Sequence, residues 1–177
     1  MGPVNKLLIE DADGASLVRR AALAALASGV VDEVVVVTGH EPARVRDALS
    51  GLPLRFTHNP EHLDGMGASL AAGARALSGW SEGAFVALGD MPAVRPEIYS
   101  ALARALSGDQ TIAAPTFDGR RGHPVLFGAR HLDALRALQG DEGARRVVRG
   151  DDASVCLVEV DDEGVLLDVD TPEDARR

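Results

Sequence analysis

Hydrophobic and polar positions follow one another in blocks that predict alternating helices and strands. The run from Ser16 to Ser28 has helical propensity, with a serine suited to cap its start and Gly29 placed to end it. The run from Asp32 to Thr38 is rich in valine, as in a parallel strand covered on both faces. The alternation continues, with helices predicted at 43–50, 68–78 and 96–106 and strands predicted at 54–58, 84–88 and 111–115.

This rhythm changes after Pro115. Asp118 and Gly119 lie between two short apolar runs and predict a hairpin, hence an antiparallel element. We therefore predict one α/β domain over residues 1–177, a Rossmann-like three-layer sandwich with a mostly parallel sheet and a short antiparallel element. The remaining pattern predicts helices near 130–138 and 143–149, strands near 154–160 and 165–169, and a carboxyl-terminal helix starting around Pro172.

The amino-terminal segment departs from this scheme. An open parallel sheet normally begins with a central strand, but Met1 to Glu10 offers only one short apolar run, directly after a Gly-Pro pair. We therefore expect a sheet that lacks a central strand and leaves the neighbouring edges unpaired.

Composition limits the function classes. Hydrophobic residues make up 46% and charged residues 25%, as in an ordinary globular domain. The formal net charge of -9 repels polyanions, which excludes nucleic acid and anionic membrane surfaces as general partners. Neither a membrane-spanning apolar run of roughly 20 residues nor a signal pattern is present, so we expect a cytoplasmic protein. The single cysteine, Cys156, is predicted to be a buried strand residue.

Acidic residues are placed where strands are predicted to end, the usual ligand-binding edge of an open parallel sheet. Asp90 follows the predicted strand 84–88, and a carboxylate there suits Mg²⁺, although a helix cap or a turn is the alternative. Asp168 and Asp170 would point to the same side of the strand predicted at 165–169. They are either a metal pair or a solvated face.

Two further loops carry candidate binding groups. The glycine-rich stretch from Gly65 to Ser69 opens a helix, where backbone amides can hold an anion, or it is an ordinary loop. Two arginine clusters, one ending at Arg121 and one starting at Arg145, could bind a phosphate, although such arginines are often only solvated. His123 is expected to be structural or to contact substrate, because no serine or cysteine nucleophile is placed beside it.

Together these motifs form an ordered set over nearly the whole chain. The set comprises Met1-Gly2, Asn5 to Leu8, Thr38-Gly39, Asn59-Pro60, Gly65 to Ser69, Leu88 to Pro92, Arg121 to Pro124, Gly140-Asp141, Gly143 to Arg145 and Asp168 to Asp174. In this order the chain resembles the MobA-like nucleotidyltransferases, and most closely their molybdenum cofactor cytidylyltransferase branch.

The resemblance implies a nucleotide-diphospho-sugar transferase type of fold and a reaction. The enzyme would transfer CMP from CTP to molybdopterin and release pyrophosphate, with a molybdoenzyme or its maturation chaperone as a possible protein partner. By resemblance, Asp90 and Asp170 would hold Mg²⁺ as the cofactor, and Lys6 would neutralise charge on the triphosphate. Substrate contacts are implied for Gly39, Asn59, Gly65, Ser69, Arg121, Gly122, His123 and Arg145.

One departure from the family pattern concerns the start of the chain. Family members begin with a strand and a loop of the form Leu-Ala-Ala-Gly-x-Ser-x-Arg-Met-Gly, whereas Met1 and Gly2 correspond to the last two positions of that loop. We expect either a start at an internal methionine or a shortened chain. The alternatives are guanylyl transfer, a different phosphorylated acceptor, an oxidoreductase-type relative, and a non-catalytic nucleotide-binding module.

Overall fold

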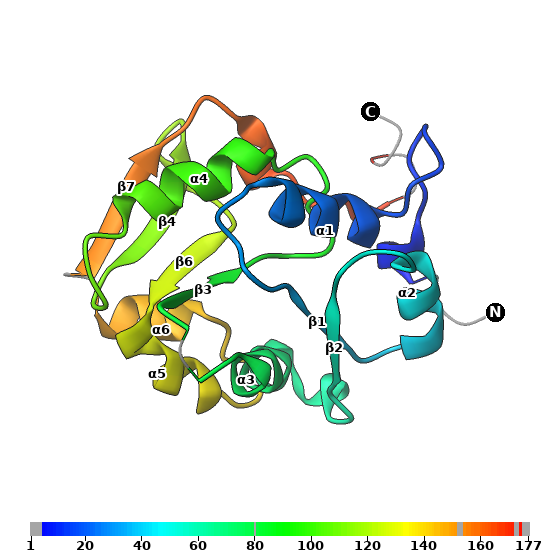
Figure 1. Cartoon of the computed structure of the whole chain (residues 1–177), viewed down its shortest axis with the longest axis horizontal. Coiled ribbons are helices and arrows are strands. Elements are labelled where there is room, and N and C mark those ends of the chain that lie inside the picture. The colour runs from blue at the N-terminus through cyan, green and yellow to red at the C-terminus, as the bar shows by residue number, and fades with distance from the viewer. Residues whose placement is uncertain (1–4, 80, 152–153, 172–173, 175–177) are drawn as a thin grey trace.

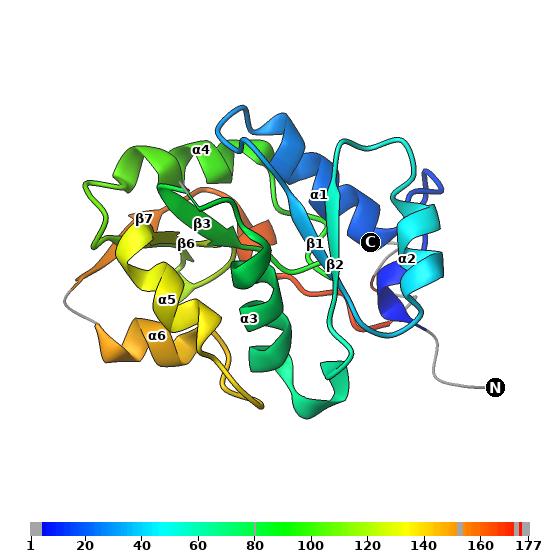
Figure 2. The ribbon, with the colours of Figure 1, turned by 60° about the horizontal axis from the view of Figure 1, so that its bottom comes forward.

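The computed structural model describes residues 5–79, 81–151, 154–171 and 174, and it arranges them in three layers. Figures 1 and 2 show the strands in the middle, with α1 and α4 on one side and α3, α5 and α6 on the other. The α helices are α1 (Leu17–Ala27), α2 (Pro42–Ala48), α3 (Met66–Ala76), α4 (Pro96–Ala105), α5 (Leu132–Arg136) and α6 (Arg145–Gly150). Short 3-10 helices are η1 (Lys6–Leu8), η2 (His62–Asp64), η3 (Ala129–His131) and η5 (Glu163–Leu166).

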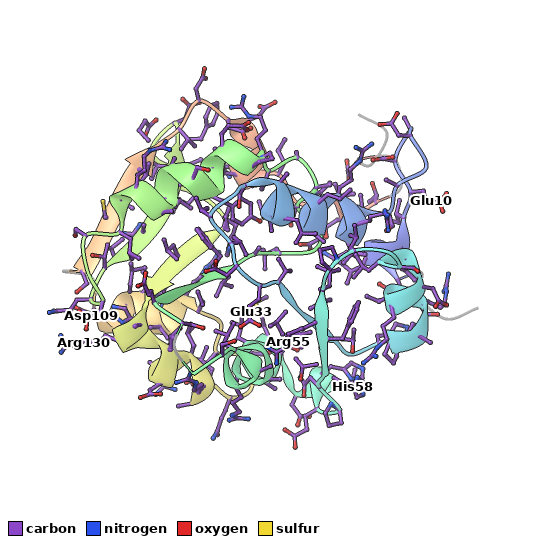
Figure 3. The ribbon with its side chains drawn as sticks, in the orientation of Figure 1. Glu10, Glu33, Arg55, His58, Asp109 and Arg130 are labelled. Atoms are coloured by element: carbon purple, nitrogen blue, oxygen red, sulfur yellow. The ribbon has the colours of Figure 1, made fainter. Side chains whose placement is uncertain are left out.

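The smaller of two sheets joins β1 (Val35–Thr38) to β2 (Arg55–His58) in parallel. Glu33, just before β1, forms an ion pair with Arg55 and accepts hydrogen bonds from the backbone N–H and the hydroxyl of Ser78. These Ser78 bonds, with the arginine, hold the pKa of Glu33 below its usual range. Figure 3 shows Glu33 and Arg55 near one another and His58 farther along β2. The network ties the start of both strands to the segment after α3.

The larger sheet has the order β3 (Gly83–Val86), β6 (Val125–Gly128), β4 (Ile112–Phe117) and β5 (Arg120–Arg121), with β7 (Val155–Glu159) also paired to β4. Strand β6 is antiparallel to both β3 and β4, whereas β7 is parallel to β4. Strands β3, β4 and β7 therefore run in the same direction, and β6 and the short β5 run against them. The predicted hairpin is confirmed, since β4 and β5 pair across Asp118 and Gly119.

The core lies on both faces of the larger sheet because side chains alternate along β4. Ile112 packs in one cluster with residues of α3, α5 and α6, while the next residue, Ala113, packs in another with residues of α1 and α4. Both are fully buried. This alternation produces the predicted three-layer α/β sandwich. No helix in the described ranges is long and apolar enough to cross a membrane.

A break separates the two sheets between β1 and β3. In the described part of the chain, no backbone hydrogen bond joins these strands. Helix α3 packs against both of them: Gly73 contacts Val37 of β1, and Ala74 shares a core cluster with Val86 of β3. The neighbouring edges are thus left without a partner strand, in agreement with the sequence. That a further strand belongs between them stays a prediction.

The open edges predict a pattern of amide hydrogen exchange. Amides of β1 and β3 that point away from β2 and β6 should exchange at least about tenfold faster than those of Ile112 and Ala113, which lie between two strands. The internal control is the set of β1 amides that face β2. Mass spectrometry or NMR measures the rates, and equally strong protection throughout β1 and β3 would show that these edges are paired.

Some local predictions were wrong. The strand predicted at 165–169 is instead η5 followed by extended chain, because Asp162 accepts a hydrogen bond from the N–H of Gly164 and starts a helical turn. The helix predicted near 130–138 divides into η3 and α5. Cys156 is exposed, since β7 pairs on one side only and lies at the rim of the sheet. Most of the helix predicted from Pro172 falls outside the described residues.

Candidate functional site

Three of the predicted site residues meet in one ionic cluster. Nζ of Lys6 lies 2.6 Å from Oδ2 of Asp90 and 2.9 Å from Oδ1 of Asp170. Lys6 and Asp170 are 164 positions apart, so the cluster joins the two ends of the described chain. We call Lys6, Asp90 and Asp170 the carboxylate cluster.

The loop after β3 positions Asp90. Strand β3 ends at Val86, two residues earlier than predicted, so Asp90 lies farther beyond the end of the strand than expected, in the following loop. The loop is held because the N–H of Met91 donates to the carbonyl of Leu88. The N–H of Val169 donates to the carbonyl of Asp90 at 2.9 Å, which brings the next residue, Asp170, to the cluster.

Helix η1 positions Lys6. Oδ1 of Asn5 accepts a hydrogen bond from the N–H of Leu7 and caps this short helix. Leu7 also packs on Gly89: a Cβ atom at position 89 would lie 3.2 Å from Cδ2 of Leu7. The backbone that carries Lys6 is therefore anchored beside the loop that carries Asp90.

The carboxylate cluster is open to solvent, but unequally. The side chains of Lys6, Asp90 and Asp170 are 40%, 18% and 68% exposed. Burial alone would lower the pKa of Lys6, but the hydrogen bonds and charges of Asp90 and Asp170 outweigh it and raise that pKa above its ordinary value. The lysine is thus a full positive charge at neutral pH.

His123 and Arg145 lie near this cluster. Burial lowers the pKa of His123, the positive charge of Arg145 lowers it further, and the Val86 carbonyl and the charge of Asp90 oppose the shift. The imidazole is therefore neutral at neutral pH. Its Nδ1 is buried and makes no hydrogen bond to any described residue. A neutral, buried ring suits a contact with substrate better than a permanent ion pair.

Gly122 fixes the place of His123. A Cβ atom at Gly122 would lie 2.2 Å from the carbonyl oxygen of Val165, so only glycine fits there without movement. The same carbonyl accepts a hydrogen bond from the N–H of His123, and the N–H of Gly122 donates to the carbonyl of Pro115. The role of Gly122 in the structure is close packing of the chain beside η5.

A second group of predicted residues gathers at the ends of β1 and β2. Asn59 is 4% exposed; its Nδ2 donates to the hydroxyl of Ser69 at 3.1 Å, and its Oδ1 accepts from the N–H of Glu61. Gly39 lies against the ring of His62, because a Cβ atom there would be 2.5 Å from Cβ of His62. Asn59 and Ser69 thus bind each other and join the end of β2 to α3.

The loop at 139–142 covers the start of α3. The N–H of Gly67 donates to the carbonyl of Gly140 at 2.7 Å, and a Cβ atom at Gly65 would lie 2.5 Å from that same oxygen. Gly65 has a φ of 119°, which favours glycine. This loop is followed, after two further residues, by Arg145, at the start of α6, whose charge acts on His123.

The carboxylate cluster does not include Arg121, Asp168 or His62. Arg121 is exposed on β5, two residues before His123. Asp168 is exposed and lies outside the carboxylate cluster. The carboxylate that contacts Lys6 together with Asp90 is therefore Asp170 and not Asp168. His62 was not among the predicted site residues, and its buried Nδ1 makes no hydrogen bond to a described residue. Its signal was the placement of Thr38-Gly39 and the 59–69 loop after neighbouring parallel strands.

The chemistry of this cluster suits a hard divalent cation. Carboxylate oxygens are preferred ligands of Mg²⁺, which is commonly held by one or two carboxylates together with substrate phosphates. The ammonium group of Lys6 between two carboxylates shows that this position already accommodates positive charge. No group of three or more metal-ligating side chains occurs among the residues that the structure describes. Two carboxylates therefore leave room for phosphate oxygens as further ligands.

A protein-family model and a curated protein both match this chain. The model of the MobA-like NTP transferase domain matches residues 1–155. Purine catabolism protein PucB of Bacillus subtilis is 34% identical over 112 residues, which are 62% of this chain and 54% of that protein. The chain thus spans about half the length of this curated relative.

Solved structures share the fold. A nucleotidyl transferase from Methanothermobacter thermautotrophicus is 30% identical with a TM-score of 0.80, covering 97% of this chain and 82% of that one. Rv0371c of Mycobacterium tuberculosis, solved in complex with manganese, is 22% identical with a TM-score of 0.78, covering 96% of this chain and 88% of that one. At this lower identity the likeness shows the fold alone.

Proposed function

The chain belongs to the MobA-like NTP transferase family, and on that premise we propose that it transfers CMP from CTP to molybdopterin with release of pyrophosphate. The observation that carries the proposal is the carboxylate cluster, in which Lys6, Asp90 and Asp170 converge from three separate segments of the chain. A cluster of one ammonium and two carboxylates, near a neutral histidine and Arg145, suits two phosphate-bearing substrates.

The proposed reaction needs no nucleophile from the protein. A phosphate oxygen of the acceptor attacks the α-phosphorus of CTP, the bond from that phosphorus to the bridging oxygen breaks, and pyrophosphate leaves. The enzyme contributes by positioning the two reactants and by offsetting their negative charge. This agrees with a site that has charged and hydrogen-bonding groups but no serine or cysteine beside His123.

We assign each predicted residue a part in this proposal. Asp90 and Asp170 would hold Mg²⁺, which when bound supplies positive charge to the phosphates. Lys6 would bind the triphosphate, with Gly39, Asn59, Gly65 and Ser69 on the nucleotide side. Arg121, Gly122, His123 and Arg145 would lie on the acceptor side. The 139–142 loop supports this division, because it contacts Gly65 and Gly67 and then leads into Arg145.

The proposed acceptor and nucleotide follow from the ordered motifs of the chain. The relative PucB is described as a purine catabolism protein, and the ordered motifs resemble the molybdenum cofactor cytidylyltransferase branch. We therefore propose molybdopterin as the acceptor and a molybdoenzyme, or its maturation chaperone, as the protein that would receive the product. The nucleotide is proposed to be CTP on the same resemblance.

The test compares CTP, GTP and ATP side by side. With molybdopterin and Mg²⁺ present, we expect pyrophosphate release and a cytidine dinucleotide product with CTP, and markedly slower release with GTP and ATP. A clear preference for GTP would replace the proposed activity with guanylyl transfer. No pyrophosphate with any of the three, while nucleotide still binds in a calorimeter, would favour a non-catalytic binding module.

A further inference from the structure

Lys6 lies at the position where a bound cation would be needed. Its Nζ atom contacts one oxygen of Asp90 and one of Asp170, the same two carboxylates that are proposed to hold Mg²⁺. The lysine therefore cannot be treated only as a phosphate-binding group. In this structure it is the counter-ion of the proposed metal ligands.

We propose that Lys6 and the divalent cation occupy the space between Asp90 and Asp170 in turn, so that cation binding releases Lys6 toward the triphosphate. The inference rests on the proposed function, because it takes these two carboxylates as the metal ligands. It assigns Lys6 a role that is separate from its contact with the nucleotide: it occupies the site until the cation arrives.

Distance and charge make the two occupants mutually exclusive. Nζ lies within 2.9 Å of an oxygen of each carboxylate, so an ion that binds both of these oxygens from the same side would take the space that the ammonium now occupies. Mg²⁺ binds oxygens at about 2.0–2.1 Å, closer than either ammonium contact. A lysine that stayed in place would hold a like charge within contact distance of the ion, which is strongly unfavourable.

The side chain of Lys6 can leave without unfolding its surroundings. Asn5 caps η1 and Leu7 packs on Gly89, so the backbone is fixed by contacts that do not involve the ammonium. The Lys6 and Asp170 side chains are 40% and 68% exposed, so water can take over their charges. Ion pairs this exposed are weak and are readily exchanged for a stronger partner.

A lysine at position 6, rather than an arginine, supports the proposed exchange with a divalent cation. Lys6 is the only lysine of the chain, whose other basic residues, apart from histidines, are all arginines. Lysine is a compact point charge on a flexible four-carbon stem, whereas the arginine fork binds a carboxylate with two donors in a fixed geometry. The only lysine thus lies where a metal ion would compete with it for the two carboxylates.

Manganese binding tests the inference without any catalytic assay. We expect Lys6→Met to bind Mn²⁺ about three- to tenfold more tightly than the wild type, measured by electron paramagnetic resonance without nucleotide, because the competing charge is gone. Lys6→Arg is the matched control that keeps the charge, and its affinity should stay at or below the wild-type value. Circular dichroism verifies that both variants are folded.

A second measurement uses the wild-type protein. Because the chain has a single lysine, ¹⁵N-lysine labelling gives one side-chain ammonium signal, and Mg²⁺ should shift it toward the position of a solvent-exposed lysine. Wild-type affinity in Lys6→Met, or a signal that does not respond to saturating Mg²⁺, would overturn the inference while the metal site stands. If Asp90→Asn does not weaken Mn²⁺ binding, the proposed metal site itself is wrong, and the inference falls with it.

Discussion

Replacement of Asp90 with Asn is expected to lower turnover by about a hundredfold or more, since a preorganised charge at the reacting phosphates is lost. The side chain keeps its size, and the backbone carbonyl of residue 90 still accepts the hydrogen bond from Val169. The fold should therefore survive. Pyrophosphate release across a Mg²⁺ titration measures the loss, and circular dichroism checks the fold.

The matched control for this substitution is Asp168→Asn. Asp168 is an exposed carboxylate two residues before Asp170 and is not part of the carboxylate cluster, so its loss should leave turnover within about twofold of the wild type. Asp170→Asn should resemble Asp90→Asn if the two carboxylates share a metal ion. Near wild-type turnover in Asp90→Asn would rule out the proposed metal site.

Most elements of the fold could be predicted because their patterns are local. The valine-rich run before Thr38, the proline at the start of α4 and the Asp118-Gly119 turn each indicate an element without reference to distant residues. The region after residue 160 was predicted wrongly, since its alternating apolar and acidic residues resemble a strand. The alternation is real, with Val169 buried between exposed Asp168 and Asp170, but no strand in the described part of the chain pairs with it.

The site was less predictable than the fold. Asp90, Asp170 and Lys6 could be named from short motifs, but their contact depends on a packing of both chain ends that no local pattern encodes. The family resemblance implied that Lys6 neutralises charge on the triphosphate, and the ion pair with both carboxylates was not foreseen. Asn59 and Ser69 were expected at the substrate, whereas the structure shows them bonded to each other. Their contact with substrate stays a prediction.

Gly122→Ala is expected to destabilise the protein by about 3 kcal/mol, the sum expected of one overpacked contact and one lost buried hydrogen bond. The added Cβ atom would lie 2.2 Å from the carbonyl oxygen of Val165 and 2.8 Å from its Cβ. Val165 is fully buried under the β4–β5 hairpin, so it has little room to move. The shift would break the hydrogen bond from the N–H of His123 to that carbonyl.

The sign of this effect distinguishes a packing role from a merely conformational one. Where space is open, glycine to alanine stabilises a protein by about 0.4–1 kcal/mol, because the unfolded chain loses freedom. Gly150→Ala is the control, since a Cβ atom at this position in α6 meets nothing within 4 Å, and its free energy of unfolding should be unchanged or slightly raised. Urea denaturation measures both variants. A Gly122→Ala protein as stable as the wild type would mean that η5 does not pack on the hairpin as closely as the structure shows, and that His123 is positioned beside Asp90 by other contacts.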